Sequence, residues 1–281
     1  MQAAVKASIR RLLPKRYTAH QILSGPLHGM RIVTSWNDYP SAILGYTEKA
    51  LMQWFSCNAR TGETWLDIGS HYGYTAMAMA RLVGAKGRVF AFEPMLSTAG
   101  CISRSIAVNR LLQVTIVPIG LGSSSELEVK RLSTTRGMAD STLNGGRDEV
   151  AIFVASFDWL WPQICGGDSR IDGVKIDVQG METEVVRGMA GVLKEWAPKL
   201  ALEVHEGVDR EGLLTLLENC GYNRDATPIE PVAGETSAQY LNNRSYEFHA
   251  GANSRHGGLS PCANPEIESV QIPVNLGKTF V

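Results

Sequence analysis

Short apolar runs alternate with segments of helical periodicity between positions 64 and 204. The runs are rich in β-branched and aromatic residues, as strands buried in a sheet are. They lie at 64–68, 88–93, 114–117, 174–178 and 200–204, and helices are predicted between them at 76–82, 97–109 and 182–193. Strands that alternate with helices form parallel sheets. The pattern therefore predicts a doubly wound, Rossmann-like α/β fold, mostly parallel, with Ser97 as a helix N-cap.

Other patterns flank and interrupt this core. A β-hairpin is predicted over 17–35 and a helix over 44–56, so residues 1–60 are interpreted as a leader and cap. Region 123–157 is an insertion that serves either as a substrate lid or as a plain surface excursion. Within it we expect a strand near Leu127 and Val129, a loop over 133–149 and a strand over 150–154. The main domain, 61–250, ends in a helix over 209–220 and an antiparallel closing strand over 245–248. The Gly- and Pro-rich segment 251–281 is predicted to be a flexible tail.

Composition narrows the function. The 281 residues are 44% hydrophobic with a net charge of −1, so no overall positive field favours nucleic acid or an anionic membrane. No apolar run approaches the roughly 20 residues of a membrane span. The five cysteines lack a Cys-x-x-Cys pair, which favours a reducing, cytoplasmic compartment. The basic start of the chain lacks the apolar core of a secretory signal. Oligomeric state stays open, with a homodimer as one option.

The sharpest motif is the segment 67–73. Asp67 ends a predicted strand, and Gly69 and Gly73 bracket a turn that contains Ser70 and His71. Open α/β sheets bind ligands beyond the carboxyl ends of such strands, where glycine allows the backbone to approach closely. A dinucleotide fingerprint would have a third glycine, and an acid there repels pyrophosphate. The same acid attracts the cationic amino group of S-adenosylmethionine, which we favour over NAD.

A second acid supports a nucleotide site. Glu93 ends the next strand, before the strand-terminating Pro94. A carboxylate at that place can accept hydrogen bonds from both ribose hydroxyls. We therefore expect the segment 67–73 together with Glu93 and Pro94 to bind the donor.

From about residue 44 to residue 206 the chain resembles the FkbM-type methyltransferases. The resemblance is carried by the segments 67–73, 90–94, 174–182, 203–206 and 45–48, and by Asn109. It implies methyl transfer from S-adenosylmethionine to a hydroxyl of a small molecule or glycan, typically a sugar or polyketide, with Glu48 on the donor side. Two positions depart from the family pattern. Gln179 stands where a glutamate is usual, and residues 122–124 lack an acid that often follows the third strand.

Methyl transfer to an alcohol needs aligned reactants and a base or a metal ion. Asp177, at the end of a central strand, is the leading candidate, and Lys175 lies on the same side of that strand. Lys175 either tunes Asp177, steers a substrate, or forms a purely structural ion pair. His205, between Glu203 and Glu206, is a second candidate base.

Other assignments remain open. Asp177 and Glu203, with His205, can alternatively hold a divalent cation such as Mg²⁺, although the spacing is not a recognised metal motif. Glu182 is interpreted as an acid that suits the start of the next helix. The rival functions are an NAD-dependent oxidoreductase and a non-catalytic module that keeps the fold for a partner.

Overall fold

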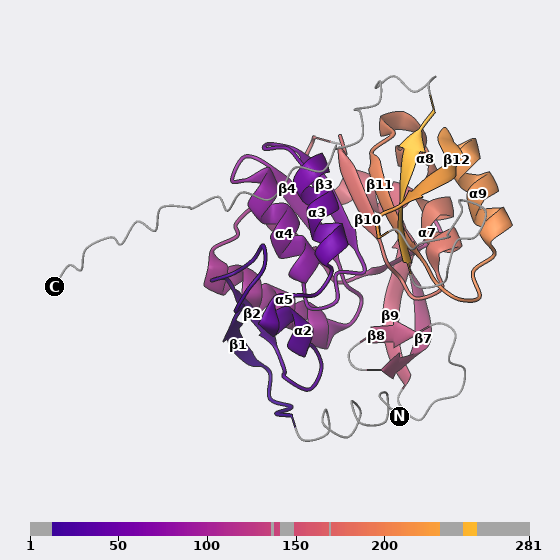
Figure 1. Cartoon of the computed structure of the whole chain (residues 1–281). Helices are drawn as coiled ribbons and strands as arrows, with labels where there is room; N and C mark the ends of the chain where they lie inside the picture. The colour runs from indigo at the N-terminus through magenta and orange to yellow at the C-terminus, as the bar shows by residue number, and fades with distance from the viewer. Residues whose placement is uncertain (1–12, 136–137, 141–148, 169, 231–243, 252–281) are drawn as a thin grey trace, which may run out of the picture.

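The computed structural model of the chain describes residues 13–135, 138–140, 149–168, 170–230 and 244–251. Its centre is a seven-stranded sheet in the order β12-β13-β11-β10-β3-β4-β5. Figure 1 shows this sheet with helices around it and a smaller group of strands projecting from it. In the order of the sheet, the strands are β12 (Tyr222–Pro228), β13 (Arg244–Ala250), β11 (Lys199–Val204), β10 (Gly173–Ile176), β3 (Thr64–Ile68), β4 (Arg88–Phe92) and β5 (Val114–Val117).

The five strands from β11 to β5 are parallel, and β13 is antiparallel to both of its neighbours. The predicted fold class is thus confirmed. The chain builds outward from β3 through β4 to β5, and then returns to place β10 on the other side of β3. Such a reversal leaves a crevice at the carboxyl ends of the two central strands, where open α/β sheets hold their ligands.

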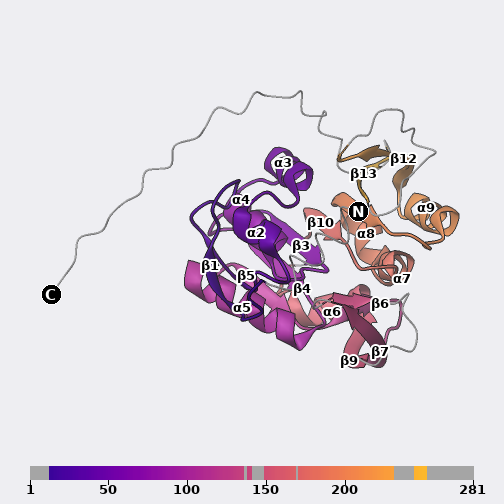
Figure 2. The same ribbon diagram turned by 60° about the horizontal axis from the view of Figure 1, so that its bottom comes forward.

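Both faces of the sheet are covered by apolar packing. Alternate side chains of a strand point to opposite faces, so Trp65 joins one core cluster while Leu66 and Ile68 join the other. Figure 2 gives a second view of the helices around the sheet. The Trp65 face is covered by α3 (Lys49–Asn58) and α4 (Tyr74–Val83), and the other by α6 (Phe157–Ile164), α7 (Glu182–Gly188), α8 (Ala190–Trp196) and α9 (Arg210–Asn219).

The N-terminal cap is continuous with this core. The predicted hairpin is present as β1 (Thr18–Gln21) paired with β2 (Arg31–Thr34). It is followed by α2 (Pro40–Leu44), which ends at Gly45 before α3 begins. The single helix predicted over 44–56 is therefore wrong at its start, because Gly45 takes a left-handed φ of 83° that interrupts it. Phe55 of α3 packs edge-on against Trp65, which joins the cap to the sheet.

The insertion forms a second sheet in the order β6-β9-β7-β8. Its strands are β6 (Gly120–Gly122), β7 (Glu128–Thr135), β8 (Met138–Asp140) and β9 (Glu149–Ser156). The predicted loop over 133–149 is wrong at its start, where β7 extends to Thr135 and pairs with β8, and at its last residue, where β9 begins. Backbone pairing stabilises these polar strands without large apolar side chains, which is why the pattern missed them.

Two further sequence expectations need correction. The helix α5 (Leu96–Asn109) begins one residue before Ser97, so its N-cap is Met95. The helix predicted over 182–193 is divided into α7 and α8 at Met189. Neither α6 nor β12 was predicted. The tail 251–281 lies outside the described residues beyond Gly251. Within the described part of the chain, no helix is both long and apolar enough to span a bilayer.

Candidate active site

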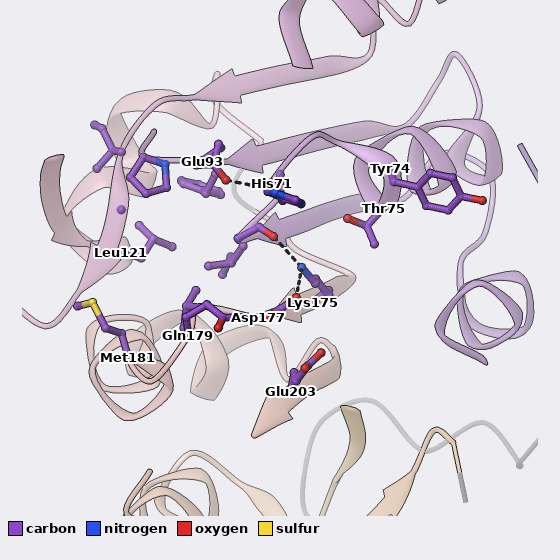
Figure 3. A pocket seen from close by; sticks show the side chains of 18 of the residues that line it. His71, Tyr74, Thr75, Glu93, Leu121, Lys175, Asp177, Gln179, Met181 and Glu203 are labelled. Carbon is purple, nitrogen blue, oxygen red and sulfur yellow. Dashed lines mark hydrogen bonds and ion pairs between the residues drawn. The ribbon is translucent and has the colours of Figure 1, made fainter. Parts of the chain in front are cut away.

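A cavity of about 370 Å³ lies at the carboxyl ends of β3, β4, β10 and β11, within the range of small-molecule sites. Figure 3 shows Glu93 and Leu121 toward one end, with Asp177 and Glu203 toward the other. The predicted site residues that line it are Glu48, Gly69, Ser70, His71, Glu93, Pro94, Lys175, Asp177 and Glu203. Asp67, Gly73 and His205 are not among the lining residues, and each lies behind one that is.

The glycine turn closes against the protein itself. The N–H groups of Gly69 and Ser70 both donate to the carbonyl of Phe92, which ties the turn to the end of β4. Gly69 has a φ of 78°, and a Cβ there would lie 1.8 Å from the backbone oxygen of Asp177. Glycine is therefore required because the loops after β3 and β10 touch. The sequence interpretation, which assigned this close approach to a ligand, is corrected on this point.

Asp67 lies beneath the turn and not on the cavity wall. Its side chain is fully buried, and its carboxylate accepts a hydrogen bond of 2.7 Å from Thr75. Lys175 Nζ lies 3.4 Å from the other oxygen of Asp67 and donates to the Gly69 carbonyl at 2.8 Å. Lys175 lines the cavity and Asp67 does not, so the charge of Asp67 affects the cavity through Lys175. A direct contact between Asp67 and the donor stays a prediction.

Lys175 also pairs with Asp177 at 3.5 Å. Burial lowers the pKa of Lys175, but the carboxylates of Asp177 and Asp67 outweigh it, and the net pKa is raised. The ammonium is therefore charged and engaged by three partners. The same-side placement of Lys175 and Asp177 predicted from the strand period is confirmed by this contact.

Glu93 is a buried carboxyl at the end of β4. One oxygen accepts the His71 N–H at 2.8 Å (Figure 3), and the other accepts the Met95 N–H at 2.9 Å. Burial raises the pKa of Glu93 to about 8, although the two backbone N–H groups lower it. Its side chain thus holds the glycine turn and remains on the cavity wall, where the sequence placed the ribose contact.

The wall beside Glu93 is apolar and comes largely from the second sheet. Leu121 belongs to β6, Ile152 and Val154 belong to β9, and Ile119 lies just before β6. The pairing of β6 with β9 brings these residues together across the insertion. Of the two interpretations of the insertion, the plain surface excursion is wrong, because its strands line the cavity. Sequence analysis found no signal for this wall, since β6 is only three residues long.

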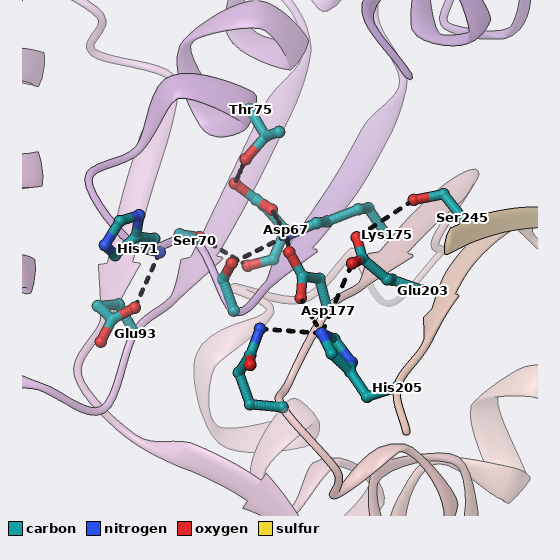
Figure 4. Close-up of polar contacts among 12 residues, drawn as sticks. Asp67, Ser70, His71, Thr75, Glu93, Lys175, Asp177, Glu203, His205 and Ser245 are labelled. Atoms are coloured by element: carbon teal, nitrogen blue, oxygen red, sulfur yellow. Dashed lines mark hydrogen bonds and ion pairs between the residues drawn. The ribbon is translucent and has the colours of Figure 1, made fainter. Parts of the chain in front are cut away.

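Three titratable side chains, those of Asp177, Glu203 and His205, meet where β10 and β11 end (Figure 4). Nε2 of His205 lies 3.5 Å from both Asp177 Oδ1 and Glu203 Oε1. Its Nδ1 lies 2.5 Å from Oε1 of Glu182. Burial lowers the pKa of His205, but the Glu182 hydrogen bond and the neighbouring carboxylates raise it overall. Burial and Asp177 raise the pKa of Glu203 to about 7, against the opposing effect of His205.

Glu182 is the residue whose role the sequence interpretation missed. It does begin α7, as expected, but its side chain is fully buried and contacts the His205 ring. Gln179 lies on the other side of the same ring, with its Nε2 2.9 Å from His205 Nε2. The two side chains fix the orientation of the imidazole. The sequence analysis singled out the segment 174–182, which ends at Glu182. The contact of Glu182 with His205, however, depends on the packing of α7 on β11, which the sequence did not predict.

Backbone strain is concentrated at the cavity. Among the described residues other than glycine, five have positive φ, and three of them line the cavity: Glu48, His71 and Gln179, each at 50–52°. The other two, Arg110 and Ala197, end helices, where this conformation is common. Positive φ in bulky residues persists where the surrounding structure enforces it, which is typical of functional sites.

The alternative metal site has a cluster to support it. Ligand atoms of Asp177, Glu203 and His205 lie within 4.8 Å of one another. Lys175 Nζ, however, already supplies a positive charge 3.5 Å from Asp177. A divalent cation would be repelled by that ammonium, so the Mg²⁺ prediction receives no support from the charges and stays a prediction.

Comparison with known proteins identifies the class. The model of the methyltransferase FkbM domain matches residues 67–224. The hexuronic acid methyltransferase AglP of Haloferax volcanii is 27% identical over 176 residues, or 58% of this chain and 64% of that protein. The chain thus spans a little under two thirds of the length of this relative.

Solved structures resemble the chain at low sequence identity. FkbM of Methylobacillus flagellatus has a TM-score of 0.43 at 16% identity, covering 74% of this chain and 52% of that one. Fibrillarin of Aeropyrum pernix has a TM-score of 0.46 at 12% identity, covering 83% and 87%. An S-adenosylmethionine-dependent O-methyltransferase of Thermotoga maritima has a TM-score of 0.43 at 16% identity, covering 76% and 68%.

Proposed function

The chain belongs to the methyltransferase FkbM domain family, and we propose that it methylates a hydroxyl group of a saccharide or another small molecule. It is an S-adenosylmethionine-dependent methyltransferase, which confirms the predicted family and sets the NAD-dependent oxidoreductase aside. The finer proposal, O-methylation, is supported chiefly by one observation. Glu93 faces the same cavity as Asp177 and Glu203, so a donor subsite adjoins carboxylates suited to deprotonate an alcohol.

The donor subsite suits the chemistry of S-adenosylmethionine. Glu93 would accept hydrogen bonds from the ribose hydroxyls, and the apolar wall around Leu121 and Ile152 would pack on the adenine. The loop at Ser70 and His71 would hold the amino-acid end near Lys175 and Asp177. The carboxylates on the wall match the positive charge of the donor.

The donor, when bound, supplies an electrophilic methyl group, which the acceptor oxygen takes as the S–C bond breaks and S-adenosylhomocysteine leaves. The protein must align the acceptor and remove its proton. Asp177 and Glu203 are the lining residues placed to accept that proton. His205, held by Glu182, lies behind both and would stabilise their charge. A base whose pKa lies near neutral pH is effective, which favours Glu203.

The first test is calorimetric titration with S-adenosylhomocysteine, with NADH in parallel. We expect micromolar binding of the former and none of the latter. Glu93→Gln should weaken binding roughly 10-fold or more, because a hydrogen bond to a charged group is lost. The control is Glu206→Gln, an exposed carboxylate beside the site that does not line the cavity. Absence of S-adenosylhomocysteine binding would contradict the donor assignment.

The second test is methyl transfer from labelled S-adenosylmethionine to a panel of glycosides and small alcohols. Asp177→Asn and Glu203→Gln should each lower kcat by roughly 10²- to 10⁴-fold if the residue is the base. Donor affinity should be kept in the variant of the true base. Binding of donor with no product from any acceptor would support the non-catalytic alternative instead.

A further inference from the structure

Part of the cavity wall is built by the N-terminal cap. Asp38 and Tyr39 precede α2, Ser41 lies in its first turn, and Glu48 precedes α3. All four precede residue 67, where the match to the family model begins. This wall, termed the cap wall and defined by these four residues, therefore lies outside the segment that the family model matches.

Asp38 is held rigidly on the cap wall. Its Oδ2 accepts hydrogen bonds from the hydroxyls of Tyr17 at 2.6 Å and Tyr72 at 3.0 Å. No described residue donates to its other oxygen, Oδ1. The hydroxyls of Tyr17 and Tyr72 thus fix the Asp38 carboxylate. Its Oδ1 can still accept a hydrogen bond, for example from a hydroxyl group of a ligand.

Aromatic rings stand beside this carboxylate. The Tyr39 ring centroid lies 5.2 Å from that of His71 and 6.0 Å from that of Tyr72. Tyr39 and His71 both line the cavity and are partly exposed. Flat rings next to a fixed acceptor suit a ring-shaped ligand that has apolar C–H faces and hydroxyl edges. A pyranose has both features, whereas a polyketide chain offers fewer hydroxyls to the carboxylates.

The charges on the cavity wall select among saccharides. Its carboxyl groups belong to Asp38, Glu48, Glu93, Asp177 and Glu203. The one lysine or arginine among the lining residues is Lys175, whose ammonium is engaged by Gly69, Asp67 and Asp177. Glu93 holds a proton at pH 7 and lies on the donor side, so it adds no charge on the acceptor side. Asp38, on the cap wall, forms no ion pair with a described residue, so an anionic acceptor would face its uncompensated carboxylate in a partly desolvated space.

We propose that the cap wall binds a neutral, hydroxyl-rich sugar residue and discriminates against uronic acids and phosphorylated sugars. The inference rests on the proposed function, because it names the acceptor class for that same cavity. Asp38 accepts a hydrogen bond from a sugar hydroxyl, and Tyr39 with His71 packs on the ring. A like-charge contact should lower the apparent affinity for the uronide by on the order of 100-fold relative to the matching neutral glycoside.

The test measures acceptor binding apart from turnover. The full chain is saturated with S-adenosylhomocysteine, and ligand-observed NMR follows methyl glucoside, galactoside and mannoside beside the corresponding uronides. These pairs differ only at C6, so ring shape and stacking are matched. At least one neutral glycoside should bind at least 10-fold more tightly than its uronide. Equal or tighter binding of every uronide, or binding of no glycoside to the loaded protein, would overturn the inference.

Variants then assign the discrimination to the cap wall. Asp38→Asn keeps an oxygen for Tyr17 and Tyr72 but removes the charge. It should weaken neutral-sugar binding roughly 10-fold and narrow the gap between glycoside and uronide. Asp225→Asn, an exposed site on β12, is the matched control and should change neither. An unchanged gap in Asp38→Asn would refute the role of the cap wall.

Donor binding separates the two proposals. Both variants should bind S-adenosylhomocysteine like the wild type, which also shows that they fold. If the wild type fails to bind S-adenosylhomocysteine, the proposed function fails, and the inference that depends on it fails with it. If donor binding is intact and the neutral preference is missing, only the inference about the acceptor is refuted.

Discussion

Replacing Lys175 by methionine removes the one ammonium that holds the two central loops together. The side chain is 6% exposed and its Nζ contacts Asp67 at 3.4 Å, Asp177 at 3.5 Å and the Gly69 carbonyl at 2.8 Å. Asp67 is fully buried, so its carboxylate would lose the one cation with which it pairs in the described part of the chain. Breaking a buried ion pair by removing one partner costs about 3–5 kcal/mol. We expect that loss in the free energy of unfolding, and a fall in Tm of roughly 10 °C.

Urea denaturation followed by circular dichroism measures the change, with Lys86→Met, an exposed lysine, as the matched control. The double variant Asp67→Asn/Lys175→Met should recover at least half of the loss, because it removes the uncompensated charge as well. A loss below about 1 kcal/mol in Lys175→Met would refute the reasoning. A double variant no more stable than the single one would refute the pairing with Asp67.

Three further predictions follow from the site. Gly69→Ala places a Cβ 1.8 Å from the Asp177 carbonyl, so we expect loss of S-adenosylhomocysteine binding and a lower Tm, whereas Gly166→Ala, where a Cβ meets nothing within 4 Å, should keep the binding. The pKa of Glu93 is about 8, so at pH 7 it holds a proton that ribose hydroxyls displace; calorimetry in two buffers should find release of roughly one proton, absent in Glu93→Gln. With the pKa of Glu203 at about 7, kcat/KM should rise with pH through 7 as the carboxylate forms, and a wild-type profile flat from pH 6 to 8 would argue against Glu203 as the base.

The raised pKa of Glu93 also makes the free energy of unfolding depend on pH. Its pKa in the folded protein is raised from 4.5 to about 8, so the folded state keeps a proton that the unfolded chain releases. Its contribution to the free energy of unfolding is complete below pH 4.5 and is lost as pH rises through about 8. This contribution of Glu93 to the pH dependence of stability should be absent from the Glu93→Gln variant, because a glutamine side chain does not titrate.

Local pattern determined much of the framework. The strand Thr64–Ile68 and the strand Val114–Val117 have the bounds predicted for them, because short β-branched and aromatic runs between polar turns are stable only as buried strands. The sequence also predicted the turn from Asp67 to Gly73 and the acid Glu93, because the chemistry of a strand end depends on the few residues at that end. Boundaries were missed where strands are polar, as in β7 and β8, because backbone pairing needs no apolar side chain.

Tertiary structure alone decided which of these residues meet. Gly69 and Lys175 are 106 positions apart, and only the placement of β10 beside β3 puts the Lys175 ammonium under the glycine turn. Glu182 reaches His205 because α7 packs on the face of β11, and Asp38 is held at the cavity by a hydrogen bond from Tyr72 in the turn after β3. Strand order and helix packing are set by the burial of apolar faces that are distant in sequence, so no local pattern encodes the contacts that result.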